Sequence, residues 1–142
     1  MPTRTATAQW DGSLRDGSGK MRMASGSYEG PFSFQSRFKE GEGTNPEELI
    51  GAAHAGCFSM QLSGELAGRG ATPESVQTEA RVEVSKVEGG FAISKIDLTT
   101  QVRAAGIDEA KFQEAAQAAK RNCPVSQALT GVEISVDATL AS

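Results

Sequence analysis

The stretch GTNPEELIGAAHAGCFSMQL, residues 43–62, predicts a long helix that carries a cysteine and a histidine. Thr44 or Asn45 can cap its N-terminus and Pro46 suits the first helical position, while two acidic residues follow in the turn where the helix dipole favours negative charge. The helix is expected to run to about Gly68, where the sequence GRG stops it. Its apolar residues are spread widely around the axis, which is typical of a buried central helix rather than a surface one.

His54 and Cys57 stand three residues apart in this helix and therefore share a face. A Cys–His nucleophile pair is one interpretation. A zinc site completed by Cys123 and carboxylates is another, although the chain has no spacing typical of zinc ligands. The third is a histidine that is hydrogen-bonded near an interface. Cys57 itself lies among alanines and beside Phe58, so desolvation raises its pKa unless a cation reaches it. The residues alone leave these alternatives open.

Cys123 directly precedes Pro124, which is expected to start a short helix. A cysteine in this place meets free backbone N–H groups and the positive end of a helix dipole, and both lower the pKa of a thiol. On these local grounds Cys123 is the more reactive cysteine. Each cysteine taken singly could be a small buried apolar residue. Cysteine pairs that oxidise in a reducing compartment are usually catalytic or redox-sensing, and two thiols in such settings favour a working pair.

The segments around the long helix predict an α+β fold in the order βββ–α–ββ–αα–β. The third strand is expected to place Phe32, Phe34 and Ser36 on one face and Arg37 on the other. No internal repeat, low-complexity tract or linker divides the chain, so a single domain over residues 1–142 is expected. The expected elements are strands at 5–10, 20–25 and 27–38, the long helix, a hairpin at 76–104 that turns at Gly89-Gly90, helices at 108–122 and from 123, and a strand at 132–140.

Composition excludes several classes of function. The net charge of −4 and the isoelectric point near 5.0 leave no basic face for nucleic acid and no polybasic patch for a membrane surface. No apolar run approaches the roughly 20 residues that span a bilayer. Residues 1–20 are polar and lack the apolar core of a signal peptide, so a cytoplasmic location is expected.

The long-helix stretch together with NCPVSQAL, residues 122–129, resembles the OsmC family, the osmotically inducible protein C family, whose sister group is the organic hydroperoxide resistance (Ohr) proteins. The resemblance spans essentially the whole chain and includes SRF at 36–38 and GFAISKIDL in the hairpin. His54 and the FSM run after Cys57 place the chain on the OsmC side. The resemblance implies an OsmC/Ohr-like fold, with antiparallel sheets wrapped around central helices, and an intertwined homodimer with active sites at its interface.

The resemblance also implies a thiol peroxidase for organic hydroperoxides and, more weakly, hydrogen peroxide. By resemblance Cys57 is the peroxidatic cysteine and Cys123 the resolving one, the reverse of the order that their local settings suggest. The family's arginine and glutamate match Arg37 and Glu47. The arginine would stabilise the Cys57 thiolate and bind the peroxide oxygens, and the carboxylate would hold the guanidinium in place. Candidate residues for an apolar substrate wall are Phe34, Ile50, Phe58 and Met60.

The implied cycle passes through a Cys57 sulfenic acid and a Cys57–Cys123 disulfide, which a dithiol reductant resets. Family resemblance suggests a dihydrolipoyl protein as this reductant, and no metal, haem or flavin cofactor.

One geometric conflict follows from the spacing of these residues. In a straight helix the ten residues between Glu47 and Cys57 span roughly 15 Å, too far for one arginine to touch both easily. We therefore expect either that Glu47 reaches Arg37 from the partner chain or that the helix bends near Gly51.

Two other functions compete with the peroxidase. A Cys–His hydrolase or transferase would use Cys57 as acyl nucleophile, but it lacks an acid to orient His54 and leaves Cys123 unused. A non-enzymatic redox sensor or ligand-binding module would use the disulfide to switch conformation, but the chain carries no DNA-binding helix or basic patch to transmit the switch.

Overall fold

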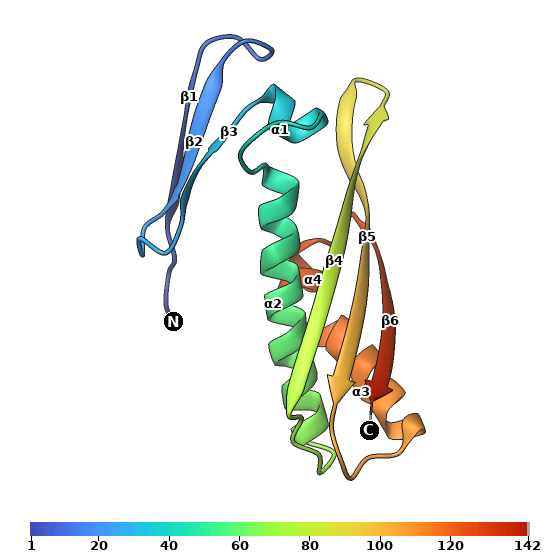
Figure 1. Ribbon diagram of the computed structural model, residues 1–142. Coiled ribbons are helices and arrows are strands. Elements are labelled where there is room, and N and C mark those ends of the chain that lie inside the picture. Colours follow the sequence, from blue (N-terminus) through green and yellow to red (C-terminus); the bar gives the residue numbers. More distant parts are fainter. Residues whose placement is uncertain (142) are drawn as a thin grey trace. The chain divides into compact units, whose positions relative to one another are not determined.

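The computed structural model describes residues 1–141, and the chain forms two compact units, Met1–Leu49 and the residues from Ile50 onward. The prediction of a single domain stays a prediction. Figure 1 shows the elements along the chain. They are β1 (Ala6–Asp11), β2 (Ser18–Met23), β3 (Glu29–Phe32), α1 (Phe34–Phe38), α2 (Pro46–Ala67), β4 (Ser75–Val87), β5 (Gly90–Arg103), α3 (Glu109–Asn122), α4 (Pro124–Ala128) and β6 (Glu133–Ala141).

The first unit contains an antiparallel sheet in the order β1-β2-β3. The rings of Trp10 and Phe32 pack with their centroids 5.2 Å apart, and Gly19 pairs with both residues in the sheet register. A Cβ atom at Gly19 would lie 2.5 Å from the Phe32 ring and 2.6 Å from the Trp10 ring. Glycine at this position therefore makes room for the aromatic pair.

The predicted third strand is wrong beyond Phe32. Ser33 caps a short helix, α1, because its side chain accepts a hydrogen bond from the Ser36 N–H while the Ser36 hydroxyl accepts one from the Ser33 N–H. This reciprocal pair is a capping box, here formed by two serines. The alternation of Phe32, Phe34 and Ser36 predicts a strand, but the reciprocal serine bonds start a helix at Phe34 instead.

The start of α2 confirms the predicted cap. The Asn45 side chain accepts from the Glu48 N–H at 2.8 Å, and the Thr44 hydroxyl donates to the Glu48 carboxylate at 2.8 Å. Gly43 precedes them with φ of 107°, and a Cβ atom there would lie 2.4 Å from the Pro31 carbonyl oxygen. Only glycine fits this close turn, which leads the chain into the helix.

The second unit contains a sheet in the order β4-β5-β6. The predicted hairpin is confirmed, since β4 and β5 pair antiparallel with Val87 opposite Gly90. The pairing of β5 with β6 is parallel, which differs from the antiparallel sheets that the resemblance implies. The reason is the crossover through α3 and α4, which returns the chain to the start of β5.

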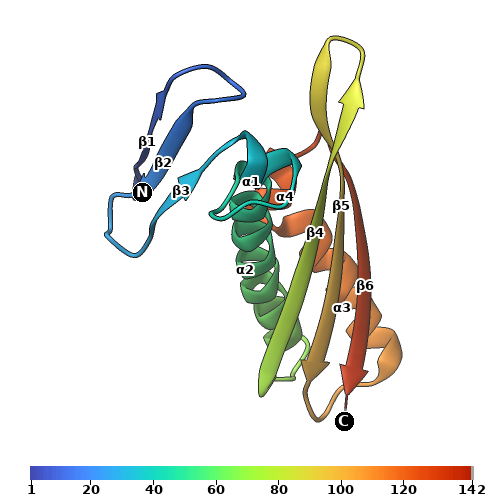
Figure 2. The same cartoon turned by 45° about the horizontal axis from the view of Figure 1, so that its top comes forward.

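Two helices cover one face of this sheet, as Figures 1 and 2 show for α2 and α3. The predicted helix at 108–122 is confirmed as α3, with Asp108 as its cap, and the proline-started helix is confirmed as α4. Most of the core between sheet and helices consists of buried aliphatic, aromatic and alanine side chains from three elements: Phe58, Leu62 and Leu66 of α2, Ile96, Leu98 and Val102 of β5, and Phe112, Ala115, Ala116 and Ala119 of α3.

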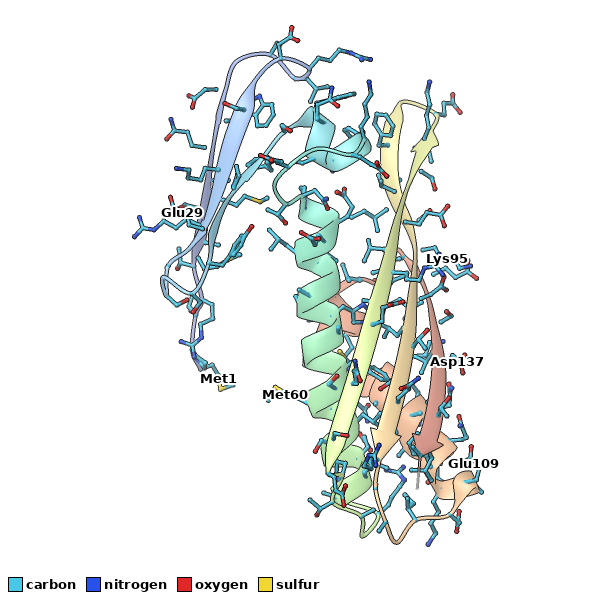
Figure 3. The ribbon with its side chains drawn as sticks, viewed as in Figure 1. Met1, Glu29, Met60, Lys95, Glu109 and Asp137 are labelled. Carbon is cyan, nitrogen blue, oxygen red and sulfur yellow. The ribbon has the colours of Figure 1, made fainter. Side chains whose placement is uncertain are left out.

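Helix α2 is not buried all round in the single chain, which corrects the prediction of a fully buried central helix. Its buried stripe includes His54, Phe58 and Leu62, whereas the opposite side is exposed. Met60 on that side is 79% exposed and points away from the sheet in Figure 3. Within the described residues of the second unit, the packing partners lie on the side of this helix that faces the core.

Candidate functional site

Arg37 and Glu47 form an ion pair within one chain. The Arg37 Nη2 lies 2.8 Å from Glu47 Oε1, and its Nε lies 3.1 Å from Oε1 and 3.3 Å from Oε2. Glu47 is only 5% exposed, while the arginine side chain is 37% exposed. Two nitrogens of the guanidinium thus hold a buried carboxylate, which fixes the plane of the charged group. Among the described residues, Arg37 Nη1 has no hydrogen-bond partner.

The pair exists because α1 is fastened to the start of α2. The Ser36 hydroxyl donates to the Thr44 carbonyl at 2.7 Å, and the Asn45 amide donates to the Ser36 carbonyl at 2.9 Å. These two bonds close the loop between the helices and place Arg37, the residue after Ser36, against Glu47 in the first turn of α2. We call this arrangement of Ser36, Thr44, Asn45, Arg37 and Glu47 the arginine clip.

The arginine clip corrects the expectation that Glu47 comes from the partner chain to meet Arg37. The pairing is intrachain, because the turn at Gly43 brings α1 back to the N-terminus of α2. The alternative of a bend near Gly51 stays a prediction, although α2 is helical without interruption from Pro46 to Ala67. The rise of roughly 15 Å along the helix from Glu47 to Cys57 therefore remains.

A pocket of about 230 Å³ lies beside Arg37 in the first unit. The Arg37 guanidinium also lies 5.1 Å from the centre of the Phe38 ring, and its charge faces an aromatic wall. Of the predicted substrate-binding residues, Phe34 lines this pocket. The full lining is Trp10, Leu14, Phe32, Ser33, Phe34, Arg37 and Phe38.

The two cysteines are adjacent in the second unit although 66 positions separate them in the sequence (123 − 57). Cys57 lies in the middle of α2 and Cys123 at the junction of α3 and α4, and each thiol shifts the pKa of the other. Both sulfurs are free rather than joined in a disulfide. Cys123 is fully buried in the core, and Cys57 is partly buried against it.

The surroundings shift the pKa values of the two thiols in opposite directions. Burial raises the pKa of Cys57 above its usual value, the Cys123 thiol raises it further, and the Val125 N–H offsets only part of this. Burial alone would also raise the pKa of Cys123. Hydrogen bonds from the Ser126 N–H, the Cys57 thiol, the Ser126 hydroxyl and the Val125 N–H outweigh burial and lower the pKa of Cys123. These directions agree with the order of acidity that the local sequence settings suggest.

His54 does not pair with Cys57. It is fully buried, and its Nε2 lies 2.7 Å from the Ser126 hydroxyl oxygen of α4. Burial lowers the pKa of His54, so the ring is neutral near pH 7. The interpretation as a Cys–His nucleophile pair loses its geometric basis, because the imidazole is engaged with Ser126 instead.

No group of three or more histidine, cysteine, aspartate or glutamate side chains within residues 1–141 is arranged to hold a metal ion. No helix in the described part of the chain is long and apolar enough to cross a membrane.

Comparison with known proteins decides the family. The family model described as OsmC-like protein matches residues 39–137. This chain belongs to the OsmC-like protein family. It is 48% identical over 136 residues to Peroxiredoxin OsmC of Escherichia coli, covering 95% of this chain and 94% of the relative. It is 33% identical over 102 residues to the organic hydroperoxide resistance protein of Xanthomonas axonopodis, covering 71% and 69% of the two chains.

Solved structures of family members share the fold. The crystal structure of the organic hydroperoxide resistance protein OhrB of Bacillus subtilis superposes with a TM-score of 0.73 at 27% identity, covering 95% of this chain and 98% of that one. An organic hydroperoxide resistance protein from Elizabethkingia anophelis gives 0.78 at 21% identity over 99% and 98% of the chains, which shows the fold alone. The predicted resemblance and the α+β fold of OsmC/Ohr type are confirmed.

The remaining predicted wall residues are not among the residues that line the Arg37 pocket. Phe58 is fully buried in the core, Ile50 packs against that core, and Met60 is exposed on the open side of α2. Their role in binding substrate stays a prediction. Sequence reasoning missed Trp10, Phe32 and Phe38 as pocket residues, and missed Ser126 beside Cys123. The CPxS spacing, which puts Ser126 one turn after Cys123, was the available signal.

Proposed function

We propose that this protein is a cysteine-based peroxidase that reduces organic hydroperoxides to alcohols. The observation that carries the proposal is the adjacency of two free thiols from distant parts of the sequence in a chain of the OsmC-like family. The names of its relatives, peroxiredoxin and organic hydroperoxide resistance protein, support this class of reaction. A cytoplasmic location, where thiols are kept reduced, is part of the proposal.

Cys57 is proposed as the peroxidatic residue. Its thiolate attacks the terminal oxygen of the hydroperoxide, the O–O bond breaks, and the alkoxide takes up a proton and leaves as an alcohol. Cys57 is thereby oxidised to a sulfenic acid. The partial exposure of Cys57 supports this order of roles, since Cys123 is fully buried.

Cys123 is proposed as the resolving residue. Its sulfur attacks the sulfenic sulfur, the S–O bond breaks, and the oxygen leaves as water once it has taken up a proton. A dithiol then reduces the Cys57–Cys123 disulfide by exchange and is itself oxidised to a disulfide. We propose a dihydrolipoyl protein as this reductant.

The arginine clip is proposed to supply the charge that Cys57 lacks. The pKa of Cys57 is raised by burial, so its thiolate needs a cation. Arg37 carries a permanent charge and an unoccupied Nη1, and Glu47 fixes its orientation. The aromatic pocket beside Arg37 supports binding of the organic part of the substrate.

A homodimer is proposed to bring the arginine clip to the thiol. Glu47 and Cys57 stand roughly 15 Å apart along one unbroken helix, and Arg37 is already bound to Glu47. In the proposed arrangement, the complete clip of one chain serves Cys57 of the other. The exposed side of α2, with Met60 and small residues, is the surface that a second chain would cover.

The proposal is tested by counting thiols in reduced protein before and after one equivalent of cumene hydroperoxide. A peroxidase loses two thiols per chain, releases cumyl alcohol, and is reset by dihydrolipoamide over repeated cycles. Parallel assays with thioredoxin and glutathione, and with hydrogen peroxide, establish the reductant and substrate preference. Oxidation without repeated turnover under any of these reductants would instead support a redox sensor.

A further inference from the structure

His54 is the one histidine of the chain, and the proposed peroxidase cycle does not use it. Its ring is fully buried on the core side of α2, where a polar side chain costs free energy unless it is hydrogen-bonded. Its Nε2 contacts the Ser126 hydroxyl at 2.7 Å, while its Nδ1 is buried with no hydrogen-bond partner among the described residues. The ring therefore makes a single directed contact.

The unpartnered Nδ1 indicates where the ring proton lies. A neutral imidazole has one N–H, and the other nitrogen is an acceptor. A proton on Nδ1 would leave a buried donor unsatisfied, which is rarer in proteins than an under-satisfied acceptor. With the proton on Nε2, the N–H donates to the Ser126 oxygen and only a lone pair remains without a partner.

This tautomer also settles the direction of the Ser126 hydroxyl. Ser126 is buried on the first turn of α4, one turn after Cys123. Since its oxygen accepts from His54, its own proton is free to donate to the sulfur of Cys123, one turn earlier, and the Ser126 hydroxyl is among the groups that lower the pKa of Cys123. The chain of donors then runs from His54 Nε2 through Ser126 Oγ to Cys123 Sγ.

We propose that His54 is a positioning residue for the resolving step, which it serves by aiming the Ser126 hydroxyl at the Cys123 thiolate. The inference rests on the proposed function, because it assigns a role in the attack of Cys123 on the Cys57 sulfenic acid. In that step the Cys123 thiolate forms the S–S bond, the sulfenic S–O bond breaks, and hydroxide leaves and becomes water with the proton that Cys123 gave up. Cys123 is oxidised and the Cys57 sulfur is reduced.

The charges around this relay do not replace His54. Besides His54, the ionisable side chains of α2 are Glu47, Glu48, Cys57 and Glu65. Those of α3 are Glu109, Lys111, Glu114, Lys120 and Arg121, with Cys123 following at the α3–α4 junction. Helix α4 has the sequence PVSQA and carries no ionisable side chain. Burial alone lowers the pKa of His54, with no contribution from a neighbouring charge.

The test separates sulfenic acid formation from disulfide formation in single-turnover reactions with cumene hydroperoxide. His54→Leu and Ser126→Ala should consume peroxide at the wild-type rate. Disulfide formation at neutral pH should slow about 10-fold, as expected for the loss of one hydrogen bond to a charged group, with sulfenic acid accumulating and trappable by dimedone. The pH midpoint of disulfide formation should rise by about one unit.

Rescue and coupling distinguish positioning from packing. His54→Gln and Ser126→Thr keep a donor and a hydroxyl, and should recover most of the rate. The double variant His54→Leu/Ser126→Ala should be no slower than Ser126→Ala, because the two residues act through one bond. Thr100→Val is the matched control, since Thr100 is fully buried and its hydroxyl is bonded to Thr78 rather than to the thiols.

Three outcomes overturn the inference. The first is that disulfide formation keeps its wild-type rate and pH midpoint in Ser126→Ala. This variant decides the question even if His54→Leu does not fold. Thr100→Val could slow disulfide formation equally, or the single effects could add in the double variant. If the wild-type protein consumes no peroxide, the proposed function fails instead, which thiol counting shows before any variant is made.

Discussion

The arginine clip and the thiol pair differ in charge and in the sequence separation of their residues. The clip joins a fixed charge to a buried carboxylate through local capping and turn bonds within 12 residues of sequence, 36 to 47. The thiol pair joins two uncharged groups from distant segments inside an apolar core. Charge and nucleophile thus come from different parts of the molecule.

Because of this difference, the proposed mechanism requires both regions. In the core, backbone N–H groups and Ser126 favour the Cys123 thiolate, while burial disfavours the Cys57 thiolate. A guanidinium on Cys57 would reverse that order, because an opposite charge in an apolar setting favours the ionised form. In the proposed mechanism the clip therefore determines which cysteine reacts first, and the following variants test each region against the other.

The largest effect is expected from the thiols themselves. Cys57→Ser should abolish peroxide consumption, because a hydroxyl at this site remains protonated and is a weak nucleophile. Cys123→Ser should still consume one equivalent and then stop at sulfenic acid, with one thiol lost per chain. Mass spectrometry after dimedone trapping checks both results. Continued turnover by Cys57→Ser would reverse the assigned roles.

The next largest effect is expected from Arg37. Arg37→Ala should lower the rate of peroxide reduction about 10²–10³-fold at neutral pH, comparable to removing one transition-state donor. Because the pKa of Cys57 is raised by burial, more thiolate forms as pH rises, and the rate of this variant should climb steeply with pH. Stopped-flow peroxide consumption across pH measures the profile.

Arg37→Lys and Glu47→Gln sharpen this result. Lysine keeps the charge but not the planar fork, so it should recover only part of the rate. Glu47→Gln keeps the guanidinium but loosens its orientation. If the rate of Arg37→Ala has the same pH dependence as the wild-type rate, the clip does not act on the thiolate.

Mixed dimers test whether the two regions meet across chains. Arg37→Ala and Cys57→Ser proteins are each nearly inactive, but co-refolded chains should regain about a quarter of the wild-type rate, since half of the dimers are mixed and each of these contains one intact site. Activity measured before and after mixing, with light scattering to establish the dimer, gives the answer. No gain from confirmed mixed dimers would place clip and thiol in the same chain.

Local patterns predicted most of the fold. The cap at Asn45, the turn at Gly89-Gly90, and the helix at 108–122 each depend on neighbours within a few residues, and all three are confirmed. Helix α1 was missed because two serines formed the capping box where Glu or Gln is the usual partner. The parallel pairing of β6 depends on the crossover, which no local pattern reveals.

The candidate site was predicted from family resemblance more than from local physics. The residues alone identified two reactive settings but ranked Cys123 first, and the acidities in the single chain keep that ranking. The contact of His54 with Ser126 joins residues 72 positions apart, so sequence spacing could not reveal it. The intrachain Arg37–Glu47 pair requires helix α1, and the sequence predicted a strand in its place.

The smallest expected effect concerns Ser36, which ties α1 to α2. Ser36→Ala removes one half of the capping box and the bond to the Thr44 carbonyl, which should cost about 1 kcal/mol of stability. Arg37 then loses its fixed position while keeping its charge, so the rate of peroxide reduction should fall only a few-fold, by much less than in Arg37→Ala. Urea unfolding and the single-turnover rate measure the two effects separately. Ser63→Ala on α2 is the matched control, because it also deletes a serine hydroxyl but lies outside the clip. A rate loss as large as that of Arg37→Ala would show that the charge works only when the clip is closed.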